Sequence, residues 1–223
     1  MDAYIKRVVL FVQQHLGDDR TGHDVAHAYR VVQLALRIIE LMPEVEAARV
    51  NRRLVQCAAW VHDVIDPKVA VDVQATETEL RAFLETLDFT EAEVDEIFFI
   101  ITHMSFSKNI ESRVPLSLNG QIVQDADRLD AIGVIGVARA LYYGGAHGDV
   151  LYDPAVAPRV LADESEYREP GTVINHFYEK LFQLKDLLNT DAARQIGEKR
   201  DLKMHSFVDD FRAEWEGSDV TDA

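Results

Sequence analysis

Residues 54–63 read LVQCAAWVHD, an apolar run that ends in the dipeptide His62-Asp63. The apolar run predicts a buried helix segment. Side chains on neighbouring helix positions point about 100° apart. His62 and Asp63 can therefore bind one ion together only where the end of this helix lies against other segments that carry ligands.

Two further segments can supply such ligands. Upstream, residues 21–31 (TGHDVAHAYRV) contain His27, and downstream, residues 125–131 (DADRLDA) contain Asp127 in an apolar helical setting. Taken singly, His27 is also compatible with a buried structural histidine, and His62 with a histidine at a helix C-terminus. Asp127 is also compatible with a helix cap or an ion-pair partner. The order His, His-Asp, Asp favours the metal interpretation when the segments are taken together.

The order of these residues and the sequence around them resemble the HD-domain superfamily of metal-dependent phosphohydrolases. His27 is followed by Arg30 and Val31, as in the family's His-x-x-Arg-Val pattern. The resemblance extends from Thr21 to Trp215 and implies an all-α fold, a helical bundle with a metal site between helices. The stretches that look like one bacterial subgroup of small stand-alone members are GHDxxH at 22–27, HDxxDxK at 62–68, DADRLDAIG at 125–133 and HFYEKL at 176–181.

The resemblance implies a metal site formed by His27, His62, Asp63 and Asp127. Two imidazoles and two carboxylates suit Mn²⁺, Fe²⁺, Zn²⁺, Ni²⁺ or Co²⁺, and Mg²⁺ is a further candidate. Manganese, which some members of the subgroup use to hydrolyse nucleoside triphosphates, is the first expectation. A single six-coordinate ion with four protein ligands keeps positions for water and a phosphate oxygen.

Three catalytic residues are expected near these ligands. Asp66 falls where related hydrolases carry an acid that orients or deprotonates water, although an Asp before Pro67 is also an ordinary helix stop. Lys68 is a candidate phosphate clamp or a solvated surface lysine. His23 is expected to contact the leaving phosphate, and Asp24 either caps the next helix or orients an imidazole.

Four residues are candidates for substrate binding. Arg128 follows the last ligand and either binds phosphate or pairs with an acid among residues 125–130. In HD proteins with two metals, histidines from the region of His103 bind the second ion. Because that second set of ligands looks incomplete here, a single metal is expected, and His103 is expected to line the site instead. His176 and Lys180 share a helix face, and either reach the pocket or dock their helix.

Composition predicts one domain at residues 1–216 and a frayed tail at 217–223. The net charge of −16 over 223 residues argues against nucleic acid as a partner, since a phosphate backbone requires a basic face. We expect no membrane partner, because no apolar run could span a bilayer. The single Cys57 suits a reducing cytoplasm. A monomer and a homodimer are both compatible with the sequence.

Helical periodicity dominates the chain, and strand signals are weak. Residues 146–171, which include Pro154, Pro158 and Pro170, predict a long loop that acts as a lid or wraps the core. Helices are expected at 8–16, 31–39, 46–64, 73–87, 90–102, 121–142, 173–188 and 192–215.

The resemblance to the HD-domain superfamily implies a metal-dependent phosphohydrolase acting on a small phosphate compound. A nucleotide is the leading substrate, with hydrolysis of a nucleoside triphosphate to the monophosphate and pyrophosphate as the specific expectation. The alternatives are a phosphomonoesterase or phosphodiesterase of the same fold, a di-iron oxygenase, and a nucleotide sensor without catalysis.

Overall fold

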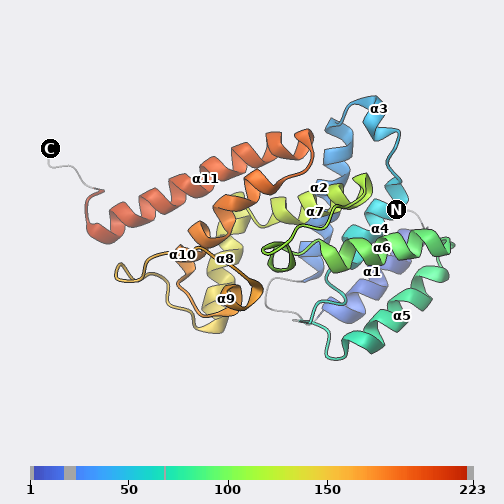
Figure 1. Ribbon diagram of the computed structural model, residues 1–223, viewed down its shortest axis with the longest axis horizontal. Helices are drawn as coiled ribbons and strands as arrows, with labels where there is room; N and C mark the ends of the chain where they lie inside the picture. The colour runs from blue at the N-terminus through green and yellow to red at the C-terminus, as the bar shows by residue number, and fades with distance from the viewer. Residues whose placement is uncertain (1–2, 18–23, 68, 220–223) are drawn as a thin grey trace.

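The computed structural model describes residues 3–17, 24–67 and 69–219, and these form helices without a β-strand (Figure 1). The prediction of an all-α fold is confirmed. Two of the helices are short 3₁₀ segments, written η. The helices in chain order are α1 (Ala3–Leu16), α2 (Val25–Leu41), α3 (Glu44–Ala47), α4 (Arg52–Val61), α5 (Val73–Glu85), α6 (Glu91–His103), η1 (Ser107–Asn109), α7 (Leu118–Asp130), α8 (Gly133–His147), α9 (Glu164–Arg168), α10 (Val173–Glu179), η2 (Leu181–Leu187) and α11 (Asp191–Glu216).

Helices α2, α4 and α7 pack against one another and form the centre of the molecule. Their inner faces repeat at helical spacing, as Val31, Ala35 and Ile38 do on α2. Figure 1 shows α1, α5 and α6 at one end of this centre and α8 to α11 at the other. None of the helices in the described part of the chain is both long and apolar enough to cross a bilayer.

Side-chain caps fix where several helices begin. The carboxylate of Asp24 accepts a hydrogen bond from the backbone N–H of His27 at 2.8 Å, so Asp24 caps α2. Thr90 and Glu93 form the expected capping box at the start of α6. These caps satisfy backbone donors that have no partner within the helix.

Three helices expected to be continuous are each divided in two. The helix predicted at 46–64 is interrupted after Ala47, and Asn51 caps the new helix α4 by accepting a hydrogen bond from Leu54. The helix predicted at 121–142 ends at Asp130 and restarts at Gly133 as α8. Gly133 has φ +77° and lies so close to Arg200 of α11 that a Cβ atom would be 2.9 Å from that side chain. The break therefore requires glycine.

The helix predicted at 173–188 is also divided, into α10 and η2. The predicted loop at 146–171 contains the short helix α9, and backbone N–H groups of Val173 and Ile174 donate to the carbonyls of Val150 and Leu151. Tyr152 packs against the core, whereas Val160 is 95% exposed. Wrapping of the core by this loop is therefore only partial.

Candidate metal centre

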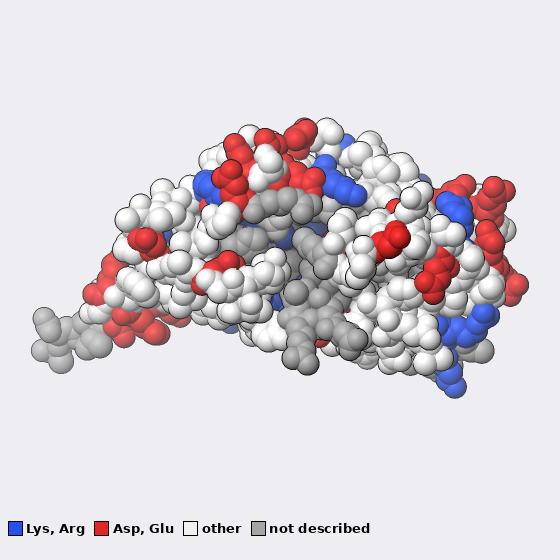
Figure 2. All heavy atoms as spheres, turned by 90° about the horizontal axis from the view of Figure 1, so that it is seen from below, with Lys and Arg blue, Asp and Glu red and all other residues white. Residues whose placement is uncertain are grey.

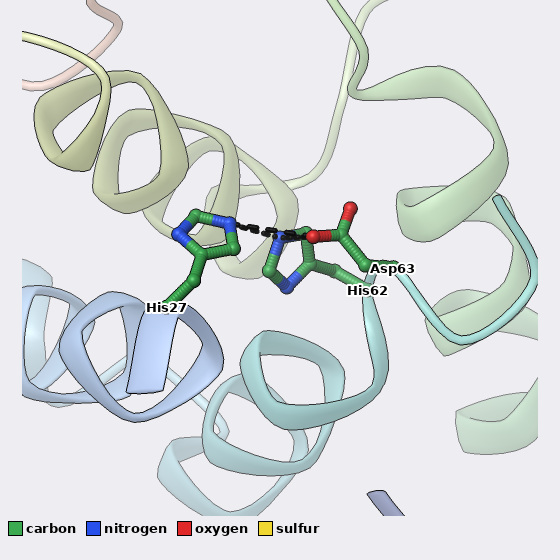
Figure 3. Close-up of side chains that lie close together, drawn as sticks. All are labelled: His27, His62 and Asp63. Atoms are coloured by element: carbon green, nitrogen blue, oxygen red, sulfur yellow. Dashed lines mark hydrogen bonds and ion pairs between the residues drawn. The ribbon is translucent and has the colours of Figure 1, made fainter. Parts of the chain in front are cut away.

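Three side chains from two segments converge in the buried centre of the molecule (Figure 3). His27 comes from α2, His62 caps the C-terminal end of α4, and Asp63 lies in the turn that follows. The two Nε2 atoms are 3.1 Å apart, and Oδ2 of Asp63 lies 3.3 Å from that of His27 and 3.2 Å from that of His62. These residues can hold a metal ion.

The end of α4 explains how His62 and Asp63 point to the same place. His62 still has helical backbone angles, but Asp63 belongs to a turn and is released from the helical 100° spacing. Both residues are buried, as is His27.

Both imidazole rings are oriented by their other nitrogen. Nδ1 of His62 lies 2.9 Å from the backbone carbonyl oxygen of Ala59, and Nδ1 of His27 lies 2.7 Å from Oδ2 of Asp130. When each Nδ1 donates its proton to these acceptors, the lone pair of each Nε2 points into the cluster. This is the usual arrangement of metal-binding histidines.

Asp127 lies at the open side of the cluster on α7. Its Oδ1 is 3.5 Å from Nε2 of His27 and 3.7 Å from Nε2 of His62. An ion with bonds of about 2.1 Å to its ligands separates neighbouring ligand atoms by roughly 3.0–3.4 Å. The spacings of 3.1–3.3 Å among His27, His62 and Asp63 fall in this range, so these three donors fit one divalent ion. The oxygen of Asp127 lies slightly farther away.

The electrostatics of the cluster favour a cation. Burial opposes the charged form of His27, but hydrogen bonds to Asp127, Asp130 and Asp63 outweigh it and raise the pKa of His27 to about 10. The pKa of His62 is raised as well: burial opposes the charged form, but the charge of Asp63, its hydrogen bond and the charge of Asp127 together outweigh burial. Grouped carboxylates thus make this buried region attract protons or a metal ion.

A second group of residues supports the cluster, and the sequence analysis did not assign it a role. Asp130 is the hydrogen-bond partner of His27, and its Oδ1 accepts from Nε of Arg30 at 2.8 Å. Arg139 of α8 also contacts Asp130 and Nδ1 of His27 through Nη1. The available signal was spacing, since Asp130 lies one helical turn after Asp127 on α7.

A cavity of about 500 Å³ lies between α8, α10 and the segment before α10. Arg139 lines it and contacts Nδ1 of His27, whereas His27, His62, Asp63 and Asp127 do not line the cavity themselves. His176 and Lys180, which were predicted to share a helix face, both line it as well.

Of the other predicted site residues, two lie on different elements of the fold and two are outside the described part of the chain. Asp66 is half-buried in the turn after Asp63, and its backbone N–H donates to the Asp63 carbonyl at 3.0 Å. His103 is at the end of α6, stacked on Phe99. His23 and Lys68 lie outside the described residues.

Arg128 has a role in helix packing that differs from the predicted contact with phosphate. It is 4% exposed and donates to the backbone carbonyl of Leu187. Burial, together with the charge of Arg113, lowers the pKa of Arg128 to about 10. Its position does not support a contact with substrate, and its predicted pairing with an acid of α7 is replaced by this backbone contact.

Comparison with known proteins identifies the family. The HD domain model matches residues 25–132, which include all four predicted ligands. A sequence relative, the protein YpgQ of Bacillus subtilis, is 36% identical over 216 residues, covering 96% of this chain and 95% of YpgQ. The chain belongs to the HD-domain family. The resemblance predicted from the sequence is confirmed, and the family makes the protein a metal-dependent phosphohydrolase.

Solved structures of HD-domain relatives share this architecture. A Lactobacillus plantarum protein has a TM-score of 0.85 and 44% identity, covering 97% of this chain and 99% of its own. An HD-superfamily hydrolase from Bacillus thuringiensis has a TM-score of 0.72 and 37% identity, covering 96% and 97%. YpgQ was crystallised in complex with ADP, and that structure has a TM-score of 0.72 and 32% identity, covering 94% and 96%.

Proposed function

We propose that this HD-domain hydrolase cleaves a nucleoside triphosphate into a nucleoside monophosphate and pyrophosphate. The observation that carries the proposal is the position of the 500 Å³ cavity, which shares Arg139 with the surroundings of the metal-binding cluster. Its volume suits a small-molecule ligand of nucleotide size. The ADP complex of the relative YpgQ supports a nucleotide as the ligand.

His27, His62, Asp63 and Asp127 would hold the divalent ion. When bound, the ion polarises the phosphoryl group and lowers the pKa of a water molecule, which supplies the nucleophile at neutral pH. Manganese is the proposed metal because imidazole and carboxylate ligands together suit it. Among the described residues, one group of His, Cys, Asp and Glu side chains meets the geometry of a metal site, which favours a single ion over a di-iron oxygenase centre.

Asp66 is the proposed general base. It follows the ligand Asp63 by three residues in the same turn, and it is half-buried. The oxygen of water would form a bond to the α-phosphorus while the bond from that phosphorus to the bridging oxygen breaks. Asp66 takes the proton of the water, and pyrophosphate leaves.

The other end of the substrate would lie in the cavity. Arg139 and Lys180 line it together with His176, Tyr143 and Tyr167, so that it offers both cationic groups and aromatic rings. Cationic groups can bind phosphate oxygens, and aromatic rings can stack on a base. A single metal site activates one water molecule, so only the α-phosphorus would lie at the metal. The β- and γ-phosphates would then be bound by residues farther from the metal. His23 and Lys68 are retained in this proposal as phosphate contacts.

Analysis of the products tests this reaction. Ribo- and deoxyribonucleoside triphosphates are incubated with the protein and Mn²⁺ or Mg²⁺, and the products are separated by chromatography. We expect monophosphate and pyrophosphate in equal amounts, formed faster with Mn²⁺. Release of orthophosphate with a diphosphate intermediate would reject attack at the α-phosphorus.

Two additional substrates separate the alternatives within this fold. Turnover of p-nitrophenyl phosphate or bis(p-nitrophenyl) phosphate, without turnover of triphosphates, would indicate a phosphomonoesterase or a phosphodiesterase. Binding of nucleotides without any turnover would indicate a sensor. The Asp63→Ala variant serves as the control for contaminating phosphatases.

A further inference from the structure

Arg139 occupies the boundary between the metal-binding cluster and the cavity. It projects from α8, and its side chain is 23% exposed. Nη1 contacts both Oδ2 of Asp130 and Nδ1 of His27. The same residue lines the 500 Å³ cavity.

The ring nitrogen of His27 that carries the proton determines whether Arg139 can form a hydrogen bond to His27 as well as to Asp130. A His27 ring whose Nε2 binds a metal must carry its proton on Nδ1, where it is donated to Asp130. A guanidinium group has only donors, so it cannot make a hydrogen bond to that N–H. When a metal is bound to His27, Asp130 is therefore the hydrogen-bond acceptor for Nη1 of Arg139.

Asp130 does not need the charge of Arg139 to be neutralised. Arg30 already binds both oxygens of this carboxylate, with Nε 2.8 Å from Oδ1 and Nη2 3.0 Å from Oδ2. Arg139 adds a second positive charge to one carboxylate. Within the described residues, the hydrogen bonds of Arg139 all use Nη1, so Nε and Nη2 can serve a ligand.

Lys180 is a second cation at the same cavity. Its Nζ donates to the hydroxyl of Tyr167 at 3.0 Å and lies over the rings of Tyr167 and Phe106, and no carboxylate partner is found among the described residues. The neighbouring Glu179 is bound by Arg159 at 2.8 Å. On the face shown in Figure 2, acidic and basic side chains are both spread over the surface, and a few basic atoms are seen within the central hollow.

We propose that Arg139 is a substrate-binding residue that holds Asp130 with Nη1 and binds the phosphates of the substrate with its other nitrogens. This inference rests on the proposed function for the assignment of a nucleotide as substrate. The contact itself requires only that the ligand carries phosphate groups. The fork of donors on a guanidinium matches phosphate oxygens. Arg139 would thus hold a phosphate group of the substrate in the cavity, beside the pair formed by Asp130 and His27.

Binding measured without turnover tests the proposal. Protein kept metal-free with EDTA is titrated with ADP, pyrophosphate and adenosine in a calorimeter. Arg139→Gln should weaken ADP and pyrophosphate binding by about 10- to 100-fold, the range expected for a lost charge-assisted hydrogen bond, and leave adenosine binding unchanged. Arg139→Lys should give a smaller loss, because an ammonium keeps the charge but not the fork.

Arg194→Gln is the matched control, since it removes the same charge from the exposed surface of α11 outside the cavity. It should bind all three compounds as the wild type does. Mn²⁺ content and circular dichroism are recorded for each variant, and Arg139→Lys keeps the test decisive if Arg139→Gln fails to fold.

Unchanged ADP and pyrophosphate binding by a folded Arg139 variant would overturn the inference. Equal loss of adenosine binding would also overturn it, because Arg139 would then shape the cavity rather than bind phosphate. If the wild type hydrolyses no triphosphate but its pyrophosphate binding depends on Arg139, the proposed reaction fails and the inference stands. If the wild type binds neither ADP nor pyrophosphate, both fail.

Discussion

Asp130 accepts a hydrogen bond from Nδ1 of His27 at 2.7 Å, although the two residues are 103 positions apart in the sequence. Each side chain is about 1% exposed. The pair joins α7 to α2 and fixes the ring so that Nε2 points at His62 and Asp63. A buried carboxylate that holds a ligand in this way tunes both the orientation and the basicity of the imidazole.

We expect Asp130→Asn to weaken metal binding while the protein stays folded. The amide cannot supply the charge that supports the Nδ1 proton of His27, and loss of such a partner typically costs about 10- to 100-fold in metal affinity. Titration of the metal-free protein with Mn²⁺ measures the effect. An unchanged dissociation constant would contradict a positioning role for Asp130.

Asp125→Asn is the matched control on the same helix. Asp125 accepts hydrogen bonds from the backbone N–H groups of Asn189 and Thr190, at 2.7 and 2.8 Å. Its hydrogen bonds within the described residues do not involve His27, His62 or Asp63. An amide would turn an N–H group towards these donors, so we expect a loss of about 1–3 kcal/mol in the free energy of unfolding. Its affinity for Mn²⁺ should remain that of the wild type.

Single substitutions of the ligands should remove both metal and activity. His62→Ala or Asp63→Ala deletes one member of the cluster, and the remaining ligands cannot complete the site. The fold should survive because the helical core extends far beyond these residues. Elemental analysis with circular dichroism checks this, and His205→Ala at an exposed position of α11 is the control. Full metal occupancy in both ligand variants would reject the site.

Asp66→Asn should separate catalysis from metal binding. If Asp66 takes the proton of the attacking water, the variant keeps its metal and kcat falls by about 100-fold. The control Asp72→Asn changes an exposed acid that caps α5, where asparagine caps equally well. Steady-state kinetics beside metal analysis decide the outcome, and a wild-type kcat would leave Asp66 as a structural residue of the turn.

Arg159 fastens the segment at 149–171 to α10. Its Nε and Nη2 bind the two oxygens of Glu179 at 3.0 and 2.8 Å, and Nη1 donates to the carbonyls of Glu166 and Glu169. We expect Arg159→Ala to raise hydrogen exchange in this segment and to raise KM, because the segment lines the cavity. Exchange in α2 and α4 should not change.

The same pair predicts a pH dependence of this segment. Burial opposes the charge of Glu179, but hydrogen bonds from Arg159 outweigh it and lower the pKa of this carboxyl. A lowered pKa means that the pair stabilises the fold above the unfolded value of about 4.3, and that this contribution is lost as the pH falls through the lower, folded value. Faster exchange at 149–171 below pH 4, absent from the Arg159→Ala variant, would match this sign. Stabilisation of the segment by acid would contradict it.

Cys57 should be chemically inert in the folded protein. It is fully buried, and burial raises the pKa of its thiol to about 12 in spite of the nearby charge of Arg53. The thiol is therefore protonated at neutral pH, while the reactive form is the thiolate. A disulfide reagent such as 5,5′-dithiobis(2-nitrobenzoate) should react only after denaturant is added. Rapid stoichiometric reaction of the native protein at pH 8 would refute the prediction.

The sequence predicted the features that depend on residue type and short-range spacing. The apolar run before His62 predicted the buried helix α4, and Thr90 with Glu93 predicted the start of α6. His27, His62 and Asp63, which form the cluster, were predicted as ligands from their order in the chain and from the resemblance of the sequence around them to the HD-domain superfamily. The break at Gly133 was missed, since helical periodicity continues on both sides of it.

The tertiary structure alone decided which charged residues meet. Asp127 and Asp130 are both acids of α7, and only the packing of α2 and α8 against that helix shows that Asp130 holds His27 and Arg139. Arg128 belongs to the same sequence motif, yet it is directed to a backbone carbonyl. The physical reason is the sequence distance over which each interaction acts. Helix propensity and capping involve residues a few positions apart, whereas a buried charge is paired with a residue from a distant part of the chain that packs against it. The sequence thus determined the helices and the ligand types, and the packing of distant helices determined their partners and the cavity beside them.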